Sequence, residues 1–453
     1  MTTRATSRAI AAHHLNRLAF GPRPGDVDRF SAMGTDAFVE EQLEARLPDP
    51  AVDRFLELLP TIRYSASEIV ILHQRDGMSR SSIECILDDL RSAKLFRAVA
   101  CENQLAEVMT DFWYNHFNVY VYTWDPSIPE YERNVIRPHA LGNFRALLGA
   151  VAASPAMVYY LDTYLNTANR VTDGKPVKGI NENYGRELLE LHTVGVTAGY
   201  TQNDVYEAAR CFTGWDFGGW HAPVYEFRFA HENHDSDPKS VFGLNIPAGG
   251  REDDGNRLLD FLAVHPKTAR FVSSRLVQRF VADNPPETLV NSCAQTFTRT
   301  GGDIREVLRT IFRSDEFRSE SVFAAKAKTP FEFVTSALRS VGGSVRDGKP
   351  LALAVADMGM PLYECKPPTG YSNRSSDWIN VSSQLHRFNF AMSIAAGEFP
   401  GVHVGRRFDS AESFADNIIG MPLSATTARA IRKVKDPVKT TSLLLASPEF
   451  QVR

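Results

Sequence analysis

Residues 81–117 read "SSIECILDDLRSAKLFRAVACENQLAEVMTDFWYNHF". Apolar residues recur three and four positions apart along this stretch, which is the repeat of an amphipathic α-helix. The same spacing is found in residues 7–20, 26–47 and 131–154. Helices with one apolar face must bury that face against other helices. The sequence therefore predicts a mainly α fold, built as a multi-helix bundle assembly.

The helical pattern is interrupted at residues 214–250, where Gly, Pro and aromatic residues replace helix formers. Within this segment "VYEFRF" (224–229) alternates as a short strand does, so we expect a small irregular insertion with a β-hairpin. We predict an N-terminal helical domain over residues 1–213, this insertion, and a C-terminal helical domain over 251–453. The last domain includes a Pro/Gly-rich loop near 359–378.

The composition limits the class of partner. The chain has 453 residues, is 43% hydrophobic, and carries a formal net charge of −4 with no long block of one sign. A small-molecule substrate is therefore expected, with no nucleic acid and no membrane as partner. The N-terminal stretch lacks an unbroken apolar core, and no window approaches a transmembrane length. These features predict a cytoplasmic protein.

Several well-known chemistries have no signature in the chain. We find no G-x-S-x-G, H-E-x-x-H, Walker, G-x-G-x-x-G or EF-hand motif, and the Glu-x-x-His pair of di-iron bundles is also missing. The five cysteines are scattered without C-x-x-C spacing, which argues against zinc knuckles and a disulfide framework. A metal site here would be of a less standard design.

Residues 179–196, "GINENYGRELLELHTVGV", combine carboxylates, an arginine and a histidine in one amphipathic stretch. At the α-helical angle per residue, Asn183, Glu187 and Glu190 share one face and His192 lies on the far shoulder of the apolar stripe. Glu187 borders the core, where a carboxylate needs a cation, a donor or a metal. A solvated helix face is the alternative interpretation.

Three further polar features accompany this stretch. His116 lies at the centre of the apolar face of "QLAEVMTDFWYNHF", where each ring nitrogen needs a partner, so it is either a satisfied core histidine or a ligand or base. His139 follows a proline and lies near a kink or helix start. The segment "HENHDSDPK" (231–239) could bind a metal or an anion, although such loops are usually solvated turns.

Seven blocks of this sequence resemble a known family when they are taken together. They are "HHLNRLAFGPRPGDVDRF" (13–30), "VMTDFWYNHFNVYVY" (108–122), "VIRPHALGNFRALLGAVAASPAMVYYLD" (135–162), "NENYGRELLELHTVGVTAGYTQNDVYEAARCFTGW" (181–215), "NHDSDPKSVFG" (233–243), "LAVHPKTARFVSSRLVQRFV" (262–281) and "AKTPFEFVTSALRS" (327–340). The chain is similar in these blocks to the bacterial family called domain of unknown function 1800.

This resemblance implies a largely helical fold and no generally established activity. It also implies export of many relatives and a protein partner of a sulfatase-like family. The sequence departs from the family pattern at Tyr114, where many relatives have a second histidine, and at Gly185, where alanine is usual. The family blocks include His116, His139, Asn183 and Glu187, and His192 in one branch of the family, so the resemblance points to the same positions as the helical geometry.

The leading functional hypothesis is a metal-assisted enzyme, with an oxidative reaction ranked slightly above a hydrolytic one. Its predicted residues are Glu187, His116 and Arg186 for catalysis, Asn183, Trp113 and Trp215 for substrate binding, and His116, His139, Glu187 and His192 as ligands of Fe, Mn or Zn. One alternative is a non-catalytic helical binding or scaffold protein. Another is a metal-free hydrolase or transferase that uses His116 and Glu187 as an acid–base pair.

Overall fold

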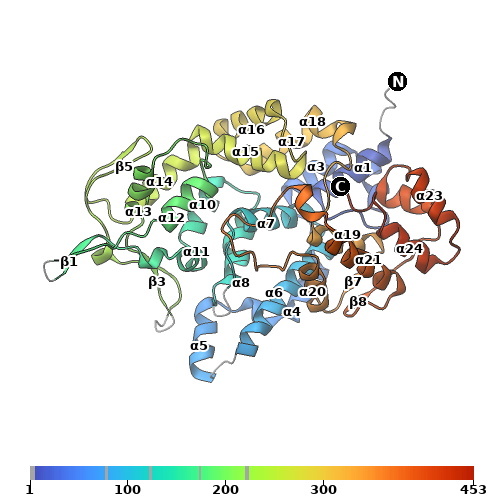
Figure 1. Cartoon of the computed structure of the whole chain (residues 1–453), viewed down its shortest axis with the longest axis horizontal. Coiled ribbons are helices and arrows are strands. Elements are labelled where there is room, and N and C mark those ends of the chain that lie inside the picture. Colours follow the sequence, from blue (N-terminus) through green and yellow to red (C-terminus); the bar gives the residue numbers. More distant parts are fainter. Residues whose placement is uncertain (1–5, 77–79, 122–124, 173–174, 220–223) are drawn as a thin grey trace.

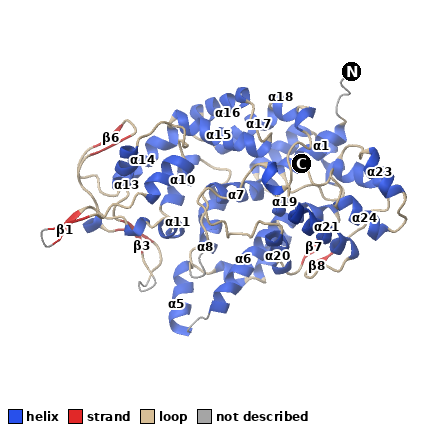
Figure 2. Cartoon of the chain, in the orientation of Figure 1, coloured by secondary structure: helices blue, strands red, loops and turns tan. Residues whose placement is uncertain are grey.

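The structure is a computed structural model that describes residues 6–76, 80–121, 125–172, 175–219 and 224–453. Helices make up most of these residues, and the strands form only short two-stranded pairs at the periphery (Figures 1 and 2). The prediction of a mainly α fold is therefore confirmed.

The first half of the chain supplies thirteen of the described α-helices. They are α1 (Ser7–Leu18), α2 (Asp26–Met33), α3 (Thr35–Glu44), α4 (Pro50–Glu57), α5 (Ala66–Asp76), α6 (Arg80–Ala100), α7 (Gln104–His116), α8 (Ile128–Glu130), α9 (Arg137–His139), α10 (Phe144–Ala152), α11 (Pro155–Tyr160), α12 (Asn183–Glu187) and α13 (Gln202–Cys211). The stretch 81–117 thus forms two helices, α6 and α7. The side chain of Asp49 accepts a hydrogen bond from the Glu102 N–H at the break between them.

The second half of the chain supplies the other α-helices of the described ranges. They are α14 (Asp253–Val264), α15 (Pro266–Phe280), α16 (Glu287–Arg299), α17 (Ile304–Arg313), α18 (Asp315–Arg318), α19 (Pro330–Ser340), α20 (Lys349–Asp357), α21 (Val381–Ala396), α22 (Ala411–Phe414), α23 (Ala425–Arg432) and α24 (Pro437–Leu445). A capping box starts α19, because Thr329 and Glu332 each accept a backbone N–H of the other residue.

Shorter helical turns and strands complete the fold. The 3₁₀ turns are η1 (Pro60–Arg63), η3 (Thr163–Leu165), η5 (His231–Asn233), η6 (Glu320–Val322) and η7 (Ser375–Trp378), and the π turns are η2 (Tyr131–Ile136), η4 (Leu188–His192) and η8 (Ala415–Ile419). The antiparallel pairs are β1 (Arg170–Thr172) with β2 (Lys175–Val177), β3 (Trp215–Phe217) with β4 (Phe227–Phe229), β5 (Lys239–Val241) with β6 (Leu244–Ile246), and β7 (Ser344–Val345) with β8 (Val402–His403).

The predicted insertion at 214–250 contains two of these hairpins. Trp215 pairs with Phe229 at the start of β3, and Val241 pairs with Leu244 at the turn between β5 and β6. Figure 1 shows these hairpins at one end of the molecule, with α23 and α24 at the other end. An irregular insertion with β-hairpin structure is therefore confirmed.

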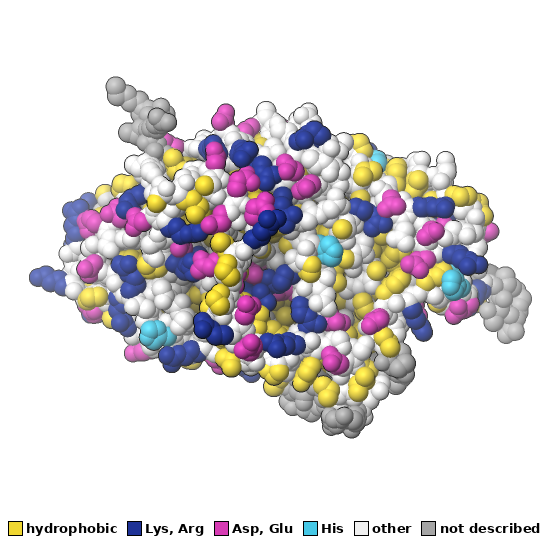
Figure 3. Space-filling view, turned by 180° about the vertical axis from the view of Figure 1, so that it is seen from behind, with side chains coloured by type: hydrophobic (Ala, Val, Ile, Leu, Met, Phe, Trp, Pro, Cys, Tyr) yellow, Lys and Arg dark blue, Asp and Glu magenta, His cyan; other side chains and the backbone are white. Residues whose placement is uncertain are grey.

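One large hydrophobic cluster runs from Ala11 to Phe450 and includes buried residues of both predicted helical domains. The domain boundaries at 213 and 250 stay a prediction. Within the described ranges, no helix has both the length and the apolar composition that a membrane span requires. The face in Figure 3 mixes basic and acidic side chains, without a large field of one sign.

Candidate functional site

His116 and Glu187, the pair on which the sequence hypothesis depends, have separate surroundings. His116 is buried at the end of α7, and its Nε2 donates to the backbone oxygen of His192 over 3.3 Å. Burial, followed by the charge of Arg275 and by His192, holds the pKa of His116 well below its ordinary value. No hydrogen bond or ion pair between described residues joins His116 to Glu187. The structure thus brings His116 to His192 rather than to Glu187.

His192 lies in the core, whereas the helical wheel put it on the far shoulder of the apolar stripe. The residues from Leu188 to His192 form the π turn η4, whose wider turn changes the direction of each side chain relative to an α-helix. The His192 ring packs against Phe117 and Tyr184, with ring centroids 5.1 and 6.2 Å away. Burial lowers the pKa of His192 to about 3, so the imidazole is neutral.

The other predicted residues of this stretch lie at the surface of α12. Glu187 is half-buried, and burial together with Glu190 raises its pKa, against the charge of Arg186. Arg186 forms ion pairs with Glu182 at 3.0 Å and Glu190 at 3.5 Å. Asn183 is exposed on the same helix. This face is therefore a charged helix surface, which was the alternative interpretation.

The predicted metal ligands do not form one ligand set. His139 uses Nδ1 to donate to the carbonyl of Val135 over 2.8 Å, within its own helical segment. Across the described ranges, no group of three or more His, Cys, Asp or Glu side chains is arranged to hold a metal ion. Since a protein metal site needs several converging donors, the geometry does not favour Fe, Mn or Zn at His116, His139, Glu187 and His192.

The two tryptophans predicted to bind substrate are core residues. Trp113 is fully buried, and its Nε1 donates to the carbonyl of Ala140 over 2.9 Å. Trp215 is 2% exposed and packs edge-on against Phe212 and Phe227. Because both rings are covered by protein atoms, they stabilise packing and offer no surface to a substrate.

Gly185, which stands where alanine is usual in the family, is explained by the packing of α12 against α13. A Cβ atom at this position would lie 2.8 Å from the backbone nitrogen of Ala209 and 3.0 Å from the carbonyl oxygen of Val205. Both are backbone atoms of α13, which cannot move away as a flexible side chain can. Gly185 thus permits the close approach of α12 to α13.

We expect Gly185→Ala to lower the free energy of unfolding by about 1–3 kcal/mol, because overpacking outweighs the better helix propensity of alanine. Urea unfolding followed by circular dichroism measures the change. Gly219→Ala is the matched control, since a Cβ there meets no atom within 4 Å. Equal stability of the Gly185 variant and the wild type would contradict this packing explanation.

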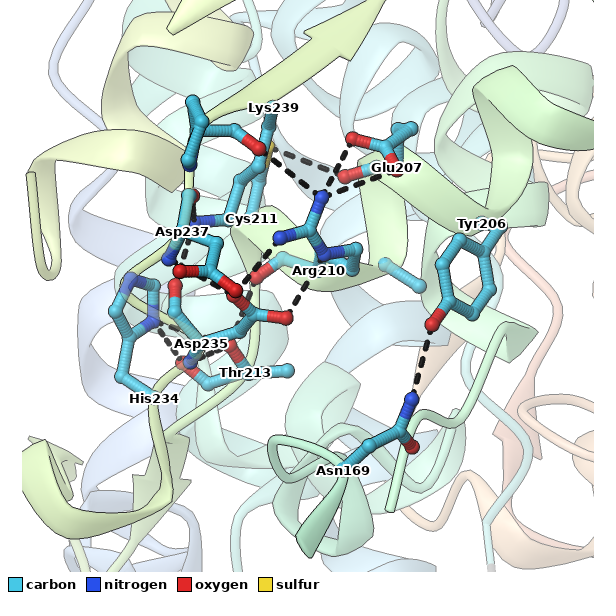
Figure 4. Close-up of polar contacts among 12 residues, drawn as sticks. Asn169, Tyr206, Glu207, Arg210, Cys211, Thr213, His234, Asp235, Asp237 and Lys239 are labelled. Carbon is cyan, nitrogen blue, oxygen red and sulfur yellow. Dashed lines mark hydrogen bonds and ion pairs between the residues drawn. The ribbon is translucent and has the colours of Figure 1, made fainter. Parts of the chain in front are cut away.

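Three side chains of the polar segment 231–239, those of His234, Asp235 and Lys239, are engaged by other residues of the protein, while His231, Glu232, Ser236 and Asp237 are exposed. Arg210 of α13 binds the carboxylate of Asp235 through Nε at 2.8 Å and Nη2 at 2.9 Å (Figure 4). The side chain of Lys239 is fully buried, and its Nζ lies 2.7 Å from the carboxylate of Asp254. His234 Nε2 lies 3.2 Å from the same carboxylate. These contacts tie the hairpin insertion to α13 and α14.

A different cluster stands out by its charge. Six buried cationic side chains surround the start of α19, and we call them the cationic centre: Arg17, Arg279, Lys326, Lys328, Arg387 and Arg453. Glu332 is the one buried carboxylate side chain that belongs with them in the described structure, and Asp283 is a partly exposed second acid. Buried charges are normally paired, so this surplus of positive charge is unusual.

Glu332 binds two members of the cationic centre. Its Oε1 lies 2.7 Å from Arg279 Nη2, and its Oε2 lies 3.0 Å from Arg453 Nε. Burial raises the pKa of Glu332, but the charges of Arg279 and Arg453 overcome this and lower it to about 2. Glu332 is therefore ionised and neutralises only part of the surrounding charge.

The remaining cations use neutral partners or an exposed acid. Arg17 is fully buried and donates through Nη2 to the carbonyl of Val322 over 2.8 Å, while its Nε and Nη1 have no partner in the described structure. Burial, then repulsion from Arg453 and Arg279, holds the pKa of Arg17 well below its ordinary value. Lys326 forms an ion pair with Asp283.

A second buried ionic network shows how cations are normally balanced in this fold. Lys94 lies 2.9 Å from Asp111, and Arg137 binds Glu132 at 2.9 Å and also forms an ion pair with Glu107. Lys94 and Arg137 thus each form an ion pair with at least one carboxylate. The cationic centre lacks that balance, and this difference identifies it as the stronger candidate for a ligand site.

A pocket opens beside the cationic centre, and we call it the Lys328 pocket. Its polar wall consists of His13, Asn16, Lys328, Glu449 and Arg453. Phe323, Ile418, Ile419 and Met421 supply most of the apolar wall. The pocket encloses about 390 Å³ of empty space, part of it open to solvent. Its enclosed part has room for little more than one water-sized group, so a ligand would lie partly in the open side of the pocket.

Lys328 differs from the other lysine of the centre. It is 3% exposed, and its Nζ lies 3.7 Å from the centroid of the Phe450 ring. No hydrogen bond or ion pair connects this Nζ to a described residue. Burial is the main cause that lowers the pKa of Lys328 to about 7, with Arg387 and Arg453 adding to it and Glu332 opposing it.

Sequence reasoning missed the cationic centre, although three family blocks contain part of it. Arg17 lies in the block 13–30, Arg279 in the block 262–281 and Lys328 in the block 327–340. One feature of the sequence could have pointed to it. The capping pattern Thr329-x-x-Glu332 marks a helix start, and Lys326 and Lys328 come directly before it. Nothing in the local pattern shows that these cations are buried.

The last turn of α7 has a clear structural role. Asn115 Nδ2 donates to the carbonyl of Tyr371 over 2.9 Å, and Asn118 Nδ2 donates to the carbonyls of Cys365 and Pro367 over 2.8 and 2.9 Å. These bonds hold the Pro/Gly-rich loop near 359–378 against the helix. The block "WYNHFN" thus preserves packing at this turn.

The fold and this site define a mainly α-helical protein with a partly open pocket beside a buried cluster of cations. Over residues 13–452 the chain matches the family described as "Protein of unknown function (DUF1800)", and it belongs to that family. Comparisons with curated proteins and with solved structures found no match.

Proposed function

We propose that this protein is an enzyme whose substrate is a small organic anion bound at the Lys328 pocket. The observation that carries the proposal is the surplus of cations around the pocket: among the described side chains, six buried cations face the buried carboxylate of Glu332 and the partly exposed acids Asp283 and Glu449. An anion placed there would supply the missing charge in a partly desolvated site, where electrostatic attraction is stronger than in water.

The composition of the pocket narrows the kind of anion. Its enclosed part is narrow, which excludes a large ligand, and its wall joins cations to apolar side chains such as Phe323 and Met421. A carboxylate on a short carbon chain would place its charge toward Lys328 and Arg453 and its carbon atoms against the apolar wall. The proposal therefore concerns a small carboxylic acid rather than a nucleotide or a polymer.

We expect small carboxylates such as pyruvate or acetate to raise the free energy of unfolding, by about 2.7 kcal/mol at a ligand concentration of ~100 times Kd. Thermal unfolding and calorimetric titration of the full chain measure this effect. Lys328→Met should weaken binding at least about tenfold. Lys433→Met, on the exposed turn after α23, is the matched control and should bind as the wild type does.

The affinity for small carboxylates should decrease as the pH rises. Because the pKa of Lys328 is lowered to about 7, the cation is lost as the pH rises through this value, and anion binding should weaken above pH 7. The charged or titratable groups around Lys328 are Lys326 and Glu332 on its own segment, His13 and Arg17 of α1, Arg387 of α21, and Glu449 and Arg453 near the C-terminal end. Equal affinity at pH 6 and pH 9, or no stabilisation by any small carboxylate, would overturn the proposal.

A further inference from the structure

Lys328 has the surroundings of a reactive amine. A lysine becomes a nucleophile when a desolvated pocket and neighbouring cations favour its neutral form. Lys328 is 3% exposed, lines a pocket with an apolar wall, and lies near Arg387 and Arg453. Its neighbour Lys326 is also buried, and burial and Arg453 lower its pKa to about 8, but its Nζ is bound to Asp283 and donates to the carbonyl of Asn373 over 3.0 Å.

The ionisation of Lys328 agrees with this geometry. Burial lowers its pKa to about 7, so about half of the molecules carry a free amine at neutral pH. An ordinary exposed lysine is almost entirely protonated at that pH. The nitrogen lone pair of Lys328 is therefore available without a separate base.

We propose that Lys328 forms an imine with the carbonyl carbon of a small oxo acid bound in the pocket. This inference rests on the proposed function, because the carboxylate of the oxo acid is the anion of that proposal. The Lys328 nitrogen attacks the carbonyl carbon, and the carbonyl oxygen becomes a hydroxyl group. The nitrogen gives up both of its protons overall, the hydroxyl leaves as water, and a carbon–nitrogen double bond remains. No oxidant or reductant is needed.

The pocket provides groups for both ends of such a substrate. The guanidinium of Arg453 is held in place by Glu332 and by the carbonyl of Arg279, to which its Nη1 and Nη2 donate over 3.3 Å. It can bind the carboxylate as a fixed cation. At the other end the protonated imine carries a positive charge, which needs a counter-ion.

Glu449 lies in the wall of the same pocket as Lys328, and we assign it as that counter-ion. Its carboxylate lines the pocket and accepts hydrogen bonds from the Ser424 N–H at 2.9 Å and from the Thr427 hydroxyl at 3.1 Å. Burial raises its pKa, but the hydrogen bonds from Ser424 and Thr427 lower it below its usual range, so Glu449 is ionised at neutral pH. An ionised carboxylate stabilises an iminium ion by its opposite charge.

Reductive trapping tests the inference directly. The full-length protein is incubated with pyruvate and sodium cyanoborohydride, and the modified lysine is mapped by peptide mass spectrometry. We expect label on Lys328, at a rate at least about tenfold above that of any other lysine. Lys326→Met should keep the label, and Lys328→Met should lose it. Because the wild-type map identifies the site, the test does not depend on the folding of the Lys328 variant.

Two outcomes would overturn the inference. One is absence of label on Lys328 while small carboxylates still stabilise the protein, in which case the proposed function stands and the imine does not. The other is equal labelling by acetone and by pyruvate without any stabilisation by carboxylates, which contradicts the oxo acid and the anion site together. Preferential labelling by pyruvate, suppressed by acetate as a competitor, supports both proposals.

Discussion

Glu332→Gln should destabilise the protein by about 3–5 kcal/mol, because it removes the one buried carboxylate that belongs with the cationic centre. The variant keeps the size of the side chain, so the loss reports charge rather than packing. Arg279 and Arg453, which now bind the two carboxylate oxygens, would be left as buried cations without an ionic partner. Urea unfolding at pH 7 measures the difference.

The same variant should change the response to acid. The pKa of Glu332 is lowered to about 2 in the folded protein, whereas an unfolded glutamate has its ordinary value near 4.5. The stabilisation is therefore complete above about pH 5 and is lost as the pH falls toward 2. The Gln variant should lack this part of the acid sensitivity. Glu57→Gln, at an exposed position, is the control, and similar losses in both variants would contradict the prediction.

Asp254→Asn should have an effect of similar size, about 3–5 kcal/mol, at the opposite end of the molecule. Asp254 and Lys239 are both fully buried at their side chains, with Nζ and Oδ2 2.7 Å apart. After the substitution, Lys239 would have only neutral acceptors: the backbone carbonyls of Asp235 and Asp237, at 2.5 and 2.9 Å, and at most the amide oxygen of the new asparagine. A buried ammonium bound only to neutral groups is poorly compensated.

A double substitution separates charge from packing at this pair. Asp254→Leu combined with Lys239→Met removes both charges, so it should be more stable than Asp254→Asn alone. The free energy of unfolding of each variant is measured in the same denaturant series. If the loss of unfolding free energy in the double variant equals the sum of the losses in Asp254→Leu and Lys239→Met, the two side chains are not coupled and the prediction is wrong.

The fold class was predictable from the sequence because apolar spacing is a local property. The segments around α6, α7, α15 and α17 each carry a helical repeat, and the structure places helices there. The interruption at 214–250 was equally clear, since Gly, Pro and aromatic residues break that repeat. The direction in which each side chain points from a helix was less predictable. Leu188–His192 form a π turn, in which side chains point in other directions than on the α-helical wheel, and His192 is buried there.

The candidate site was not predictable because its residues come from distant parts of the chain. Arg17, Arg279, Lys328 and Arg453 each read as ordinary basic residues among the 50 lysines and arginines of the sequence. Their burial depends on how α1, α15, α19 and the C-terminal segment pack together. His116 was correctly predicted to lie in the core, but its partner was a backbone carbonyl and not the side chain of Glu187.

The contact between Arg17 and the carbonyl of Val322 has a consequence for synthesis on the ribosome. These two residues are 305 positions apart in the chain. At a translation rate of roughly 5–20 residues per second, about 15–60 seconds pass between the emergence of the first and that of the second. During this time α1 cannot complete its native packing, because Arg17 lacks its hydrogen-bond acceptor even after α2 and α7 have been made. Maturation of this protein is therefore coupled to the last third of its own translation.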